Sequence, residues 1–178
     1  MNAILKELVG SVPPDPQADL PDWPYRIEQL GLVLPDDYLA LMKVYGPGKF
    51  DDFLLLLCPG AEPRAFDLLW RRSRALDDLR QRAADGEEFG HSVAPGSEEL
   101  LPWAVTDNGD TLYWVTAHPD PNKWSIALNE GRGPEWNDYH GTATEFLAAV
   151  FARRTHPAIL PDDFPSDHPE FASLANLL

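Results

Sequence analysis

The segment LPWAVTDNGDTLYWV, residues 101–115, constrains the fold more than any other part of the chain. It places Asn108-Gly109 between two extended apolar segments, which is the strongest short-range signal for a β-hairpin. A two-residue loop would fix the pairing of the two strands. The expected partners are Asp107 with Asp110, Thr106 with Thr111, Val105 with Leu112, Ala104 with Tyr113 and Trp103 with Trp114. Because strand residues alternate between faces, both tryptophans then share one face, which we expect to be buried.

Two further segments predict strands. FLLLLC, residues 53–58, is a short apolar run before Pro-Gly, which is typical of a buried strand and makes Cys58 a buried apolar residue. KWSIALNEGRGPEWNDYHG, residues 123–141, predicts a second hairpin. Its first strand alternates Trp124, Ile126 and Leu128, its turn spans residues 129–133, and its return strand carries Trp136 and Tyr139.

Apolar residues at helical spacing predict short helices over 23–31 and 35–46 and a longer one over 66–83. The capping-box pair Thr142 and Glu145 opens a further helix over 142–154. The helix at 66–83 also contains the only basic cluster, at Arg71, Arg72, Arg74, Arg80 and Arg82. We expect these arginines to form a solvated face paired with nearby acids, and phosphate binding is the alternative.

This order of elements predicts a single α+β domain. Its sheet is mostly antiparallel and built from hairpins, and N-terminal, middle and C-terminal helices cover it. The domain is expected to span residues 23–154. Proline spacing in residues 1–22 suggests a loose N-terminal arm with a short possible helix, and residues 155–178 read as a Pro-rich C-terminal tail, again with a short possible helix.

The charge balance limits the classes of partner. The chain has 29 acidic and 14 basic residues, a formal net charge of −15, so phosphate-rich nucleic acids and anionic membranes are disfavoured and a basic partner is favoured. The alternative is that the acidity only keeps the protein in solution. A single cysteine excludes an internal disulfide, and the N-terminal residues lack the pattern of a signal peptide, so we expect a cytoplasmic protein.

Little in the sequence indicates catalysis. The five histidines are scattered, no phosphate-binding glycine loop or nucleophile elbow is present, and DNGD is too short for an EF-hand loop. The carboxylates of Asp107, Asp110, Glu130, Glu135 and Asp138 offer acid and base pairs, but so acidic a chain contains such pairs by chance. We therefore expect neither an enzyme nor a metal or cofactor site.

The combination of LGLVLPDDYLALMKVYGPG, LLPWAVTDNGDTLYWVT and WSIALNEGRGPEWNDYHGTATEFLAAVFA resembles the SUKH superfamily, the relatives of the fungal cell-wall-assembly regulator. The resemblance covers roughly residues 23–153, and the helix at 66–83 looks like an elaboration of the usual pattern. The resemblance implies an α+β fold with a central antiparallel sheet. It also implies an immunity protein that neutralises a toxin, often a nuclease, or else a regulatory scaffold with another protein partner. No catalytic residues come with it.

A candidate partner surface follows from the charge distribution. Residues 85–145 contain twelve acids and two bases, and most of the predicted hairpins lie there. Carboxylates at the hairpin tips beside partly exposed aromatic rings would fit the basic cleft of a toxin. The residues expected on this surface are Asp107, Asp110, Trp124, Glu130, Glu135, Trp136, Asp138 and Tyr139. The alternative is that the rings belong to the core and the carboxylates only solvate the loops.

Overall fold

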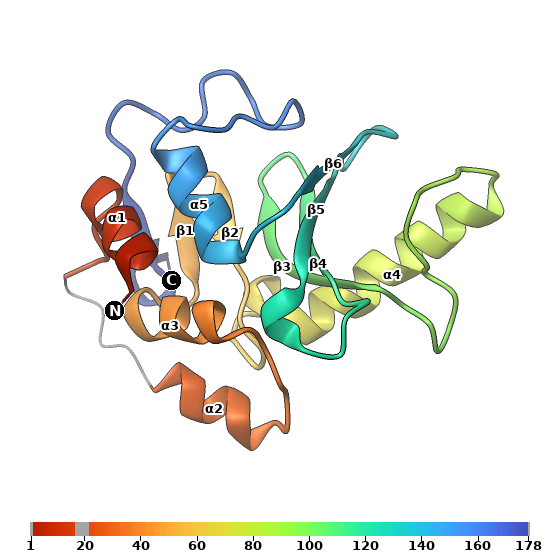
Figure 1. Cartoon of the computed structure of the whole chain (residues 1–178), viewed down its shortest axis with the longest axis horizontal. Helices are drawn as coiled ribbons and strands as arrows, with labels where there is room; N and C mark the ends of the chain where they lie inside the picture. The colour runs from red at the N-terminus through yellow and green to blue at the C-terminus, as the bar shows by residue number, and fades with distance from the viewer. Residues whose placement is uncertain (1, 17–21, 178) are drawn as a thin grey trace.

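A computed structural model describes residues 2–16 and 22–177 of the chain. Within these residues a single antiparallel sheet of seven strands runs in the order β6-β5-β4-β3-β2-β1-β7 (Figure 1). The strands are β1 (Gly48–Phe50), β2 (Leu54–Leu56), β3 (Leu100–Thr106), β4 (Thr111–Val115), β5 (Ser125–Asn129), β6 (Trp136–Tyr139) and β7 (Phe171–Ser173). The predicted α+β fold with a sheet built from hairpins is confirmed.

Six α-helices accompany the sheet in the described part of the chain. They are α1 (Ala3–Ser11), α2 (Trp23–Gln29), α3 (Asp36–Val44), α4 (Leu68–Ala84), α5 (Ala143–Phe151) and α6 (Leu174–Leu177). Two 3₁₀ turns, η1 (Arg64–Phe66) and η2 (Pro121–Lys123), precede α4 and β5. The capping box predicted for α5 is present: Glu145 N–H bonds to the Thr142 side chain, and the Glu145 carboxylate accepts from Thr142 N–H.

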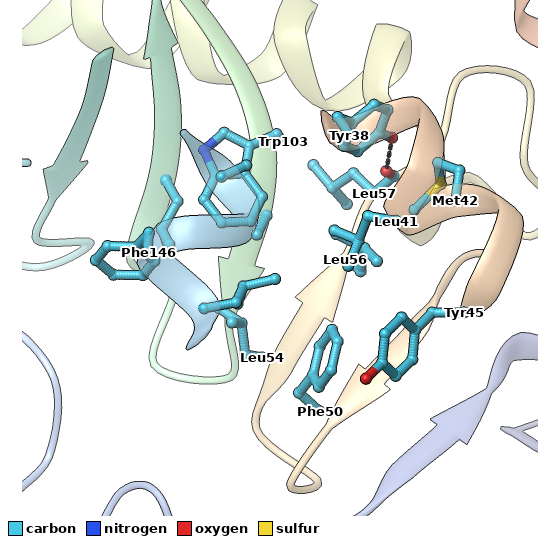
Figure 2. Close-up of a cluster of buried hydrophobic side chains, with 14 of the residues drawn as sticks. Tyr38, Leu41, Met42, Tyr45, Phe50, Leu54, Leu56, Leu57, Trp103 and Phe146 are labelled. Atoms are coloured by element: carbon cyan, nitrogen blue, oxygen red, sulfur yellow. Dashed lines mark hydrogen bonds between the residues drawn. The ribbon is translucent and has the colours of Figure 1, made fainter. Parts of the chain in front are cut away.

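The main core lies between one face of the sheet and the helices α1, α3 and α5 (Figure 2). Trp103 and Trp114 are buried there beside Tyr38 and Phe146, with the two indole centroids 6.2 Å apart. A smaller core fills the opposite face, where Leu76 and Leu79 of α4, among others, cover Leu100, Tyr113 and Trp136. Helices therefore cover both faces of the sheet, and α4 extends away from its middle (Figure 1).

The β3–β4 hairpin differs from the predicted register. Its loop has three residues, since Thr106 N–H donates to the Asp110 carbonyl at 2.9 Å and Gly109 N–H donates to the Thr106 carbonyl at 3.0 Å. Gly109 has φ +94°, a value that glycine adopts without strain, as a three-residue hairpin loop requires. The expected pairing of Asp107 with Asp110 is therefore wrong. A bulge between Pro102 and Ala104 shifts the register again, so Trp103 does not pair with Trp114, although both share the predicted core.

The expected loose arm and tail are also corrected. Leu5 and Leu8 of α1 are buried in the main core, and the Tyr45 hydroxyl donates to the Val12 carbonyl at 2.7 Å. At the other end of the chain β7 pairs with β1. A Cβ at Gly48 would lie 2.4 Å from the Ala172 carbonyl, so the absence of a side chain there lets β7 approach. Both segments thus belong to the domain, and the part of the predicted arm at 17–21 lies outside the described residues.

Candidate functional site

Three hairpin loops lie at the same end of the strands of the sheet. They comprise residues 51–53 between β1 and β2, residues 107–110 between β3 and β4, and residues 130–135 between β5 and β6. Because all the strands are antiparallel and these hairpins follow one another in the sheet, their loops point in the same direction (Figure 1). We call these three loops the hairpin edge. It contains the acids Asp51, Asp52, Asp107, Asp110, Glu130 and Glu135, against one arginine, Arg132.

Lys49 of β1 joins the first loop to the second. Its Nζ lies 2.9 Å from Asp52 Oδ1 and 2.7 Å from Asp107 Oδ2, and Asp107 N–H donates to the Phe53 carbonyl at 3.0 Å. Partial burial disfavours the charged amine, but the hydrogen bonds to Asp107 and Asp52 outweigh it and raise the pKa of Lys49. Asp107 is on the surface, as expected, but it already has a cationic partner.

Asp110 is buried beneath the hairpin edge and connects the second loop to the third by a hydrogen bond. Only 4% of it is exposed, and its carboxylate accepts from the Thr106 hydroxyl at 2.7 Å and from Gly131 N–H at 3.0 Å. The close approach needs a glycine, because a Cβ at Gly131 would lie 2.4 Å from the Gly109 carbonyl carbon. Asp110 therefore supports the edge from beneath and does not lie exposed on it as expected.

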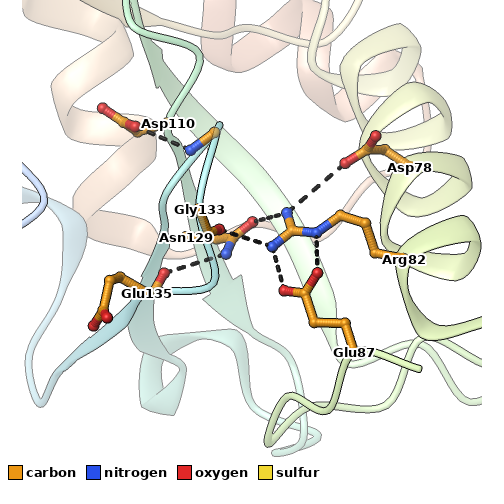
Figure 3. Close-up of polar contacts among 8 residues, drawn as sticks. Asp78, Arg82, Glu87, Asp110, Asn129, Gly133 and Glu135 are labelled. Carbon is orange, nitrogen blue, oxygen red and sulfur yellow. Dashed lines mark hydrogen bonds and ion pairs between the residues drawn. The ribbon is translucent and has the colours of Figure 1, made fainter. Parts of the chain in front are cut away.

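Arg82 of α4 holds the third loop from the opposite face of the sheet (Figure 3). Its guanidinium donates to Asn129 Oδ1 at 2.9 Å and to the Gly133 carbonyl at 3.0 Å, and it forms a two-point contact with Glu87. The hydrogen bonds from Arg82 lower the pKa of Glu87. No sequence pattern marks this role, because Arg82 is one of five arginines on the predicted helix and its partners Asn129 and Gly133 lie 47 and 51 positions away.

Glu130 and Glu135 carry the free carboxylates of the third loop. Within the described part of the chain neither side chain forms a hydrogen bond or an ion pair, although their backbones pair through Glu130 N–H and the Glu135 carbonyl at 3.0 Å. Glu135 is exposed and Glu130 is partly buried over Gly133. The hairpin edge therefore presents acidic groups on a backbone fixed by Lys49, Asp110 and Arg82.

The three aromatic residues expected on the partner surface, Trp124, Trp136 and Tyr139, do not lie together on the hairpin edge. Trp124 lies at the far end of the sheet, where its indole packs on Trp114, with ring centroids 6.1 Å apart. Trp136 stacks on Tyr113 on the α4 face, with centroids 6.0 Å apart, whereas Tyr139 packs on Phe146 on the other face, at 5.3 Å. The spacing explains this separation, since strand residues three positions apart point to opposite faces.

Asp138 also lies apart from the hairpin edge. It is exposed on β6 beside the α4 face, and its Oδ1 lies 3.6 Å from His91 Nε2. Of the eight expected residues the structure thus brings Asp107, Glu130 and Glu135 together at the surface, with Asp110 beneath them. This arrangement can offer negative charge to a cationic group. It does not form a carboxylate pair from Asp107 and Asp110, because one side chain is tied to Lys49 and the other is buried.

No group of three or more His, Cys, Asp or Glu side chains in residues 2–16 and 22–177 is arranged to hold a metal ion. The helices in these ranges include none with the length and apolar character needed to cross a membrane. Comparison with protein-family models, curated proteins and solved structures finds no match to this chain.

Proposed function

We propose that the chain is an immunity-type binding protein whose hairpin edge covers a basic surface of a toxin, such as the cleft of a nuclease. The observation that carries the proposal is the excess of carboxylates on a fixed edge, where Glu130 and Glu135 have no cationic partner within the described residues. A rigid acidic surface loses little conformational freedom on binding and attracts a cationic partner over a distance.

The separation of the three aromatic residues changes which interactions are expected to supply the binding energy at the hairpin edge. Since Trp124, Trp136 and Tyr139 do not form one surface, charge has to supply most of the recognition there. Electrostatic recognition mainly accelerates association and weakens as salt is added. We therefore expect the association rate with the toxin, more than the dissociation rate, to depend on Glu130 and Glu135.

The test begins with a toxin-like protein encoded beside the gene. Co-expression should restore growth to cells that make the toxin, and the purified pair should form a complex. Changing Glu130 and Glu135 together to lysine should slow association about tenfold at low salt. The matched control changes two exposed glutamates at the other end of the molecule, Glu28→Lys and Glu62→Lys, and thus alters net charge equally.

Two results would reject the proposal. If the neighbouring product neither binds nor is neutralised, the chain is not its immunity protein. If the control pair slows association as much as the Glu130 and Glu135 pair, net charge rather than the hairpin edge attracts the partner.

A further inference from the structure

Three arginines in η1 and in the first half of α4 form no ion pair with an acid in the described part of the chain. In the second half Arg80 pairs with Glu98 at 2.6 Å and Arg82 contacts Glu87, as predicted for a face paired with nearby acids. Arg64, Arg71 and Arg74 form no ion pair within the described residues. In a chain of net charge −15 such a local group of free cations is a distinct surface.

Two large apolar side chains lie among these arginines. Leu69 is 40% exposed and Trp70 is 36% exposed. The guanidinium carbons of Arg71 and Arg74 lie 5.8 and 5.7 Å from the centre of the Trp70 ring, within the range of a cation–π contact. Arg71 is further fixed because its Nε donates to the Ala65 carbonyl at 2.8 Å. The indole and two cations are therefore held together before any partner arrives.

A further exposed apolar side chain, Leu30 just after α2, lies near the start of α4. Leu30 is 49% exposed, and its Cδ1 would lie 3.6 Å from a Cβ at Gly60. Gly60 N–H in turn donates to Asp67 Oδ1 at 3.1 Å, and the same carboxylate caps α4 by accepting from Leu69 N–H at 3.0 Å. We call the surface formed by Arg64, Arg71, Arg74, Leu69, Trp70 and Leu30 the basic pole.

The basic pole and the hairpin edge lie at opposite ends of the sheet. α4 follows the end of β2 that points away from the hairpin loops, and α2 lies at the same far end (Figure 1). At physiological ionic strength charges are screened over about 8 Å, so a ligand at the pole senses the charges of that end, its arginines together with the exposed Glu28 and Glu62, more than the distant hairpin edge. The two ends can therefore bind partners of opposite charge.

We propose that the basic pole binds an acidic protein segment that also carries aliphatic side chains. Carboxylates would pair with Arg64 and Arg74, whose guanidinium groups match carboxylate geometry, and the aliphatic groups would cover Leu30 and Leu69. A nucleic acid fits less well, because it leaves the leucines uncovered and because Trp70 already has two guanidinium neighbours where a base would stack. A second copy also fits less well, since its acidic loops DNGD and EGRGPE contain no large aliphatic side chain.

The test is direct binding of a labelled probe to the full chain. The probe is a short fluorescein-labelled peptide of glutamate and aspartate interrupted by leucines, and its binding is followed by fluorescence anisotropy at low and physiological salt. The same peptide with serine in place of leucine tests the apolar contribution. We expect the leucine peptide to bind more tightly than the serine peptide and to weaken as salt is added.

Variants locate the site. Arg74→Glu and Trp70→Ala should each weaken binding of the leucine peptide roughly tenfold, as expected for residues at the centre of a binding surface. Arg132→Glu makes the same charge change on the hairpin edge and should leave binding nearly unchanged. Circular dichroism and thermal melting of each variant separate lost binding from lost folding, and Arg64→Glu supplies a second charge variant outside α4.

Several results would overturn the inference. If the leucine peptide does not bind even at low salt, or if Arg132→Glu weakens it as much as Arg74→Glu, the basic pole is not its site. If a labelled single-stranded oligonucleotide binds more tightly and Arg74→Glu abolishes that binding, the partner is a nucleic acid. If light scattering shows self-association that Arg74→Glu removes, the occupant is a second copy. None of these results bears on the toxin complex, which uses the other end of the sheet.

Discussion

Two aspartates of the β3–β4 hairpin differ in what surrounds them. Asp107 is half exposed at its side chain and contacts Lys49, whereas Asp110 is buried and accepts from the Thr106 hydroxyl of β3 and from Gly131 N–H of the third loop. An exposed ion pair is weakened by water and by the entropy of two flexible side chains, but a buried acceptor leaves its donors unpaired when it is removed. The two residues therefore contribute differently to stability, although the sequence places them symmetrically around Asn-Gly.

We predict that Asp110→Ala lowers the free energy of unfolding by about 2 kcal/mol or more, because Gly131 N–H and the Thr106 hydroxyl lose their acceptor. Asp107→Ala should cost less than about 1 kcal/mol. Urea unfolding followed by tryptophan fluorescence measures both. Equal losses in the two variants would mean that the Asp110 carboxylate does not hold the loops together.

Some features of the helices and strands follow from a local sequence pattern, whereas others depend on contacts between residues far apart in the sequence. The two predicted hairpins, the long Arg-rich helix and the capped helix α5 follow from periodicity within each segment, and the structure has them. The three-residue loop does not follow, because Asn-Gly suits both a two-residue loop and the last two positions of a three-residue one. Arg82 could not be singled out either, since its partners are brought to it only by folding.

The packing of the two terminal segments also does not follow from local sequence pattern. Proline-rich spacing near residues 13–24 and after 155 is typical of loose segments, yet the short apolar stretches beyond those prolines reach the core. Whether a brief amphipathic segment docks depends on the surface that the rest of the domain leaves open, which no local pattern reveals. The α1–α5 contact and the β7–β1 pairing are of this kind.

Helix α1 gives a direct test of this docking. Leu8 is fully buried in the main core, so Leu8→Ala should lower the free energy of unfolding by about 3 kcal/mol through lost burial and a residual cavity. Lys6→Ala, on the exposed side of the same helix, should change it by less than about 0.5 kcal/mol. Chemical denaturation measures the free energy of unfolding of both variants. A negligible loss for Leu8→Ala would show that α1 is an arm after all.

The contact between α4 and its following loop should depend on pH. Arg82 lowers the pKa of Glu87 below 4.5, so this carboxyl stabilises the folded state above pH 4.5, and the contribution is lost as the pH falls through the lower folded-state value. Glu87→Gln removes the titrating group and should flatten the acid-side fall of the melting temperature between about pH 5 and 3. Glu88→Gln, at an exposed neighbour, should keep the wild-type slope. Parallel slopes for wild type and Glu87→Gln would contradict the prediction.

Across the whole molecule the charges are unevenly distributed. Glu130 and Glu135 on the hairpin edge form no ion pair within the described residues, and at the other end of the sheet Arg64, Arg71 and Arg74 form none either. The sequence predicted the acidic hairpin tips but not this separation, because it depends on which arginines find acids in the folded chain. A molecule of this kind can attract a basic partner at one end while holding an acidic segment at the other.

The net charge of −15 also acts on the folded state itself. Like charges in a compact domain repel one another, so salt should raise the melting temperature until the repulsion is screened. We expect an increase of about 3 °C or more, mostly below about 0.3 M NaCl, because the screening length has already fallen from about 30 Å at 0.01 M to about 8 Å at 0.15 M. The Glu130→Lys and Glu135→Lys pair adds four charge units, which brings the net charge from −15 to −11, and should show a smaller increase. A melting temperature that stays flat or falls with salt would mean that ion pairs such as Lys49 with Asp107 outweigh the repulsion.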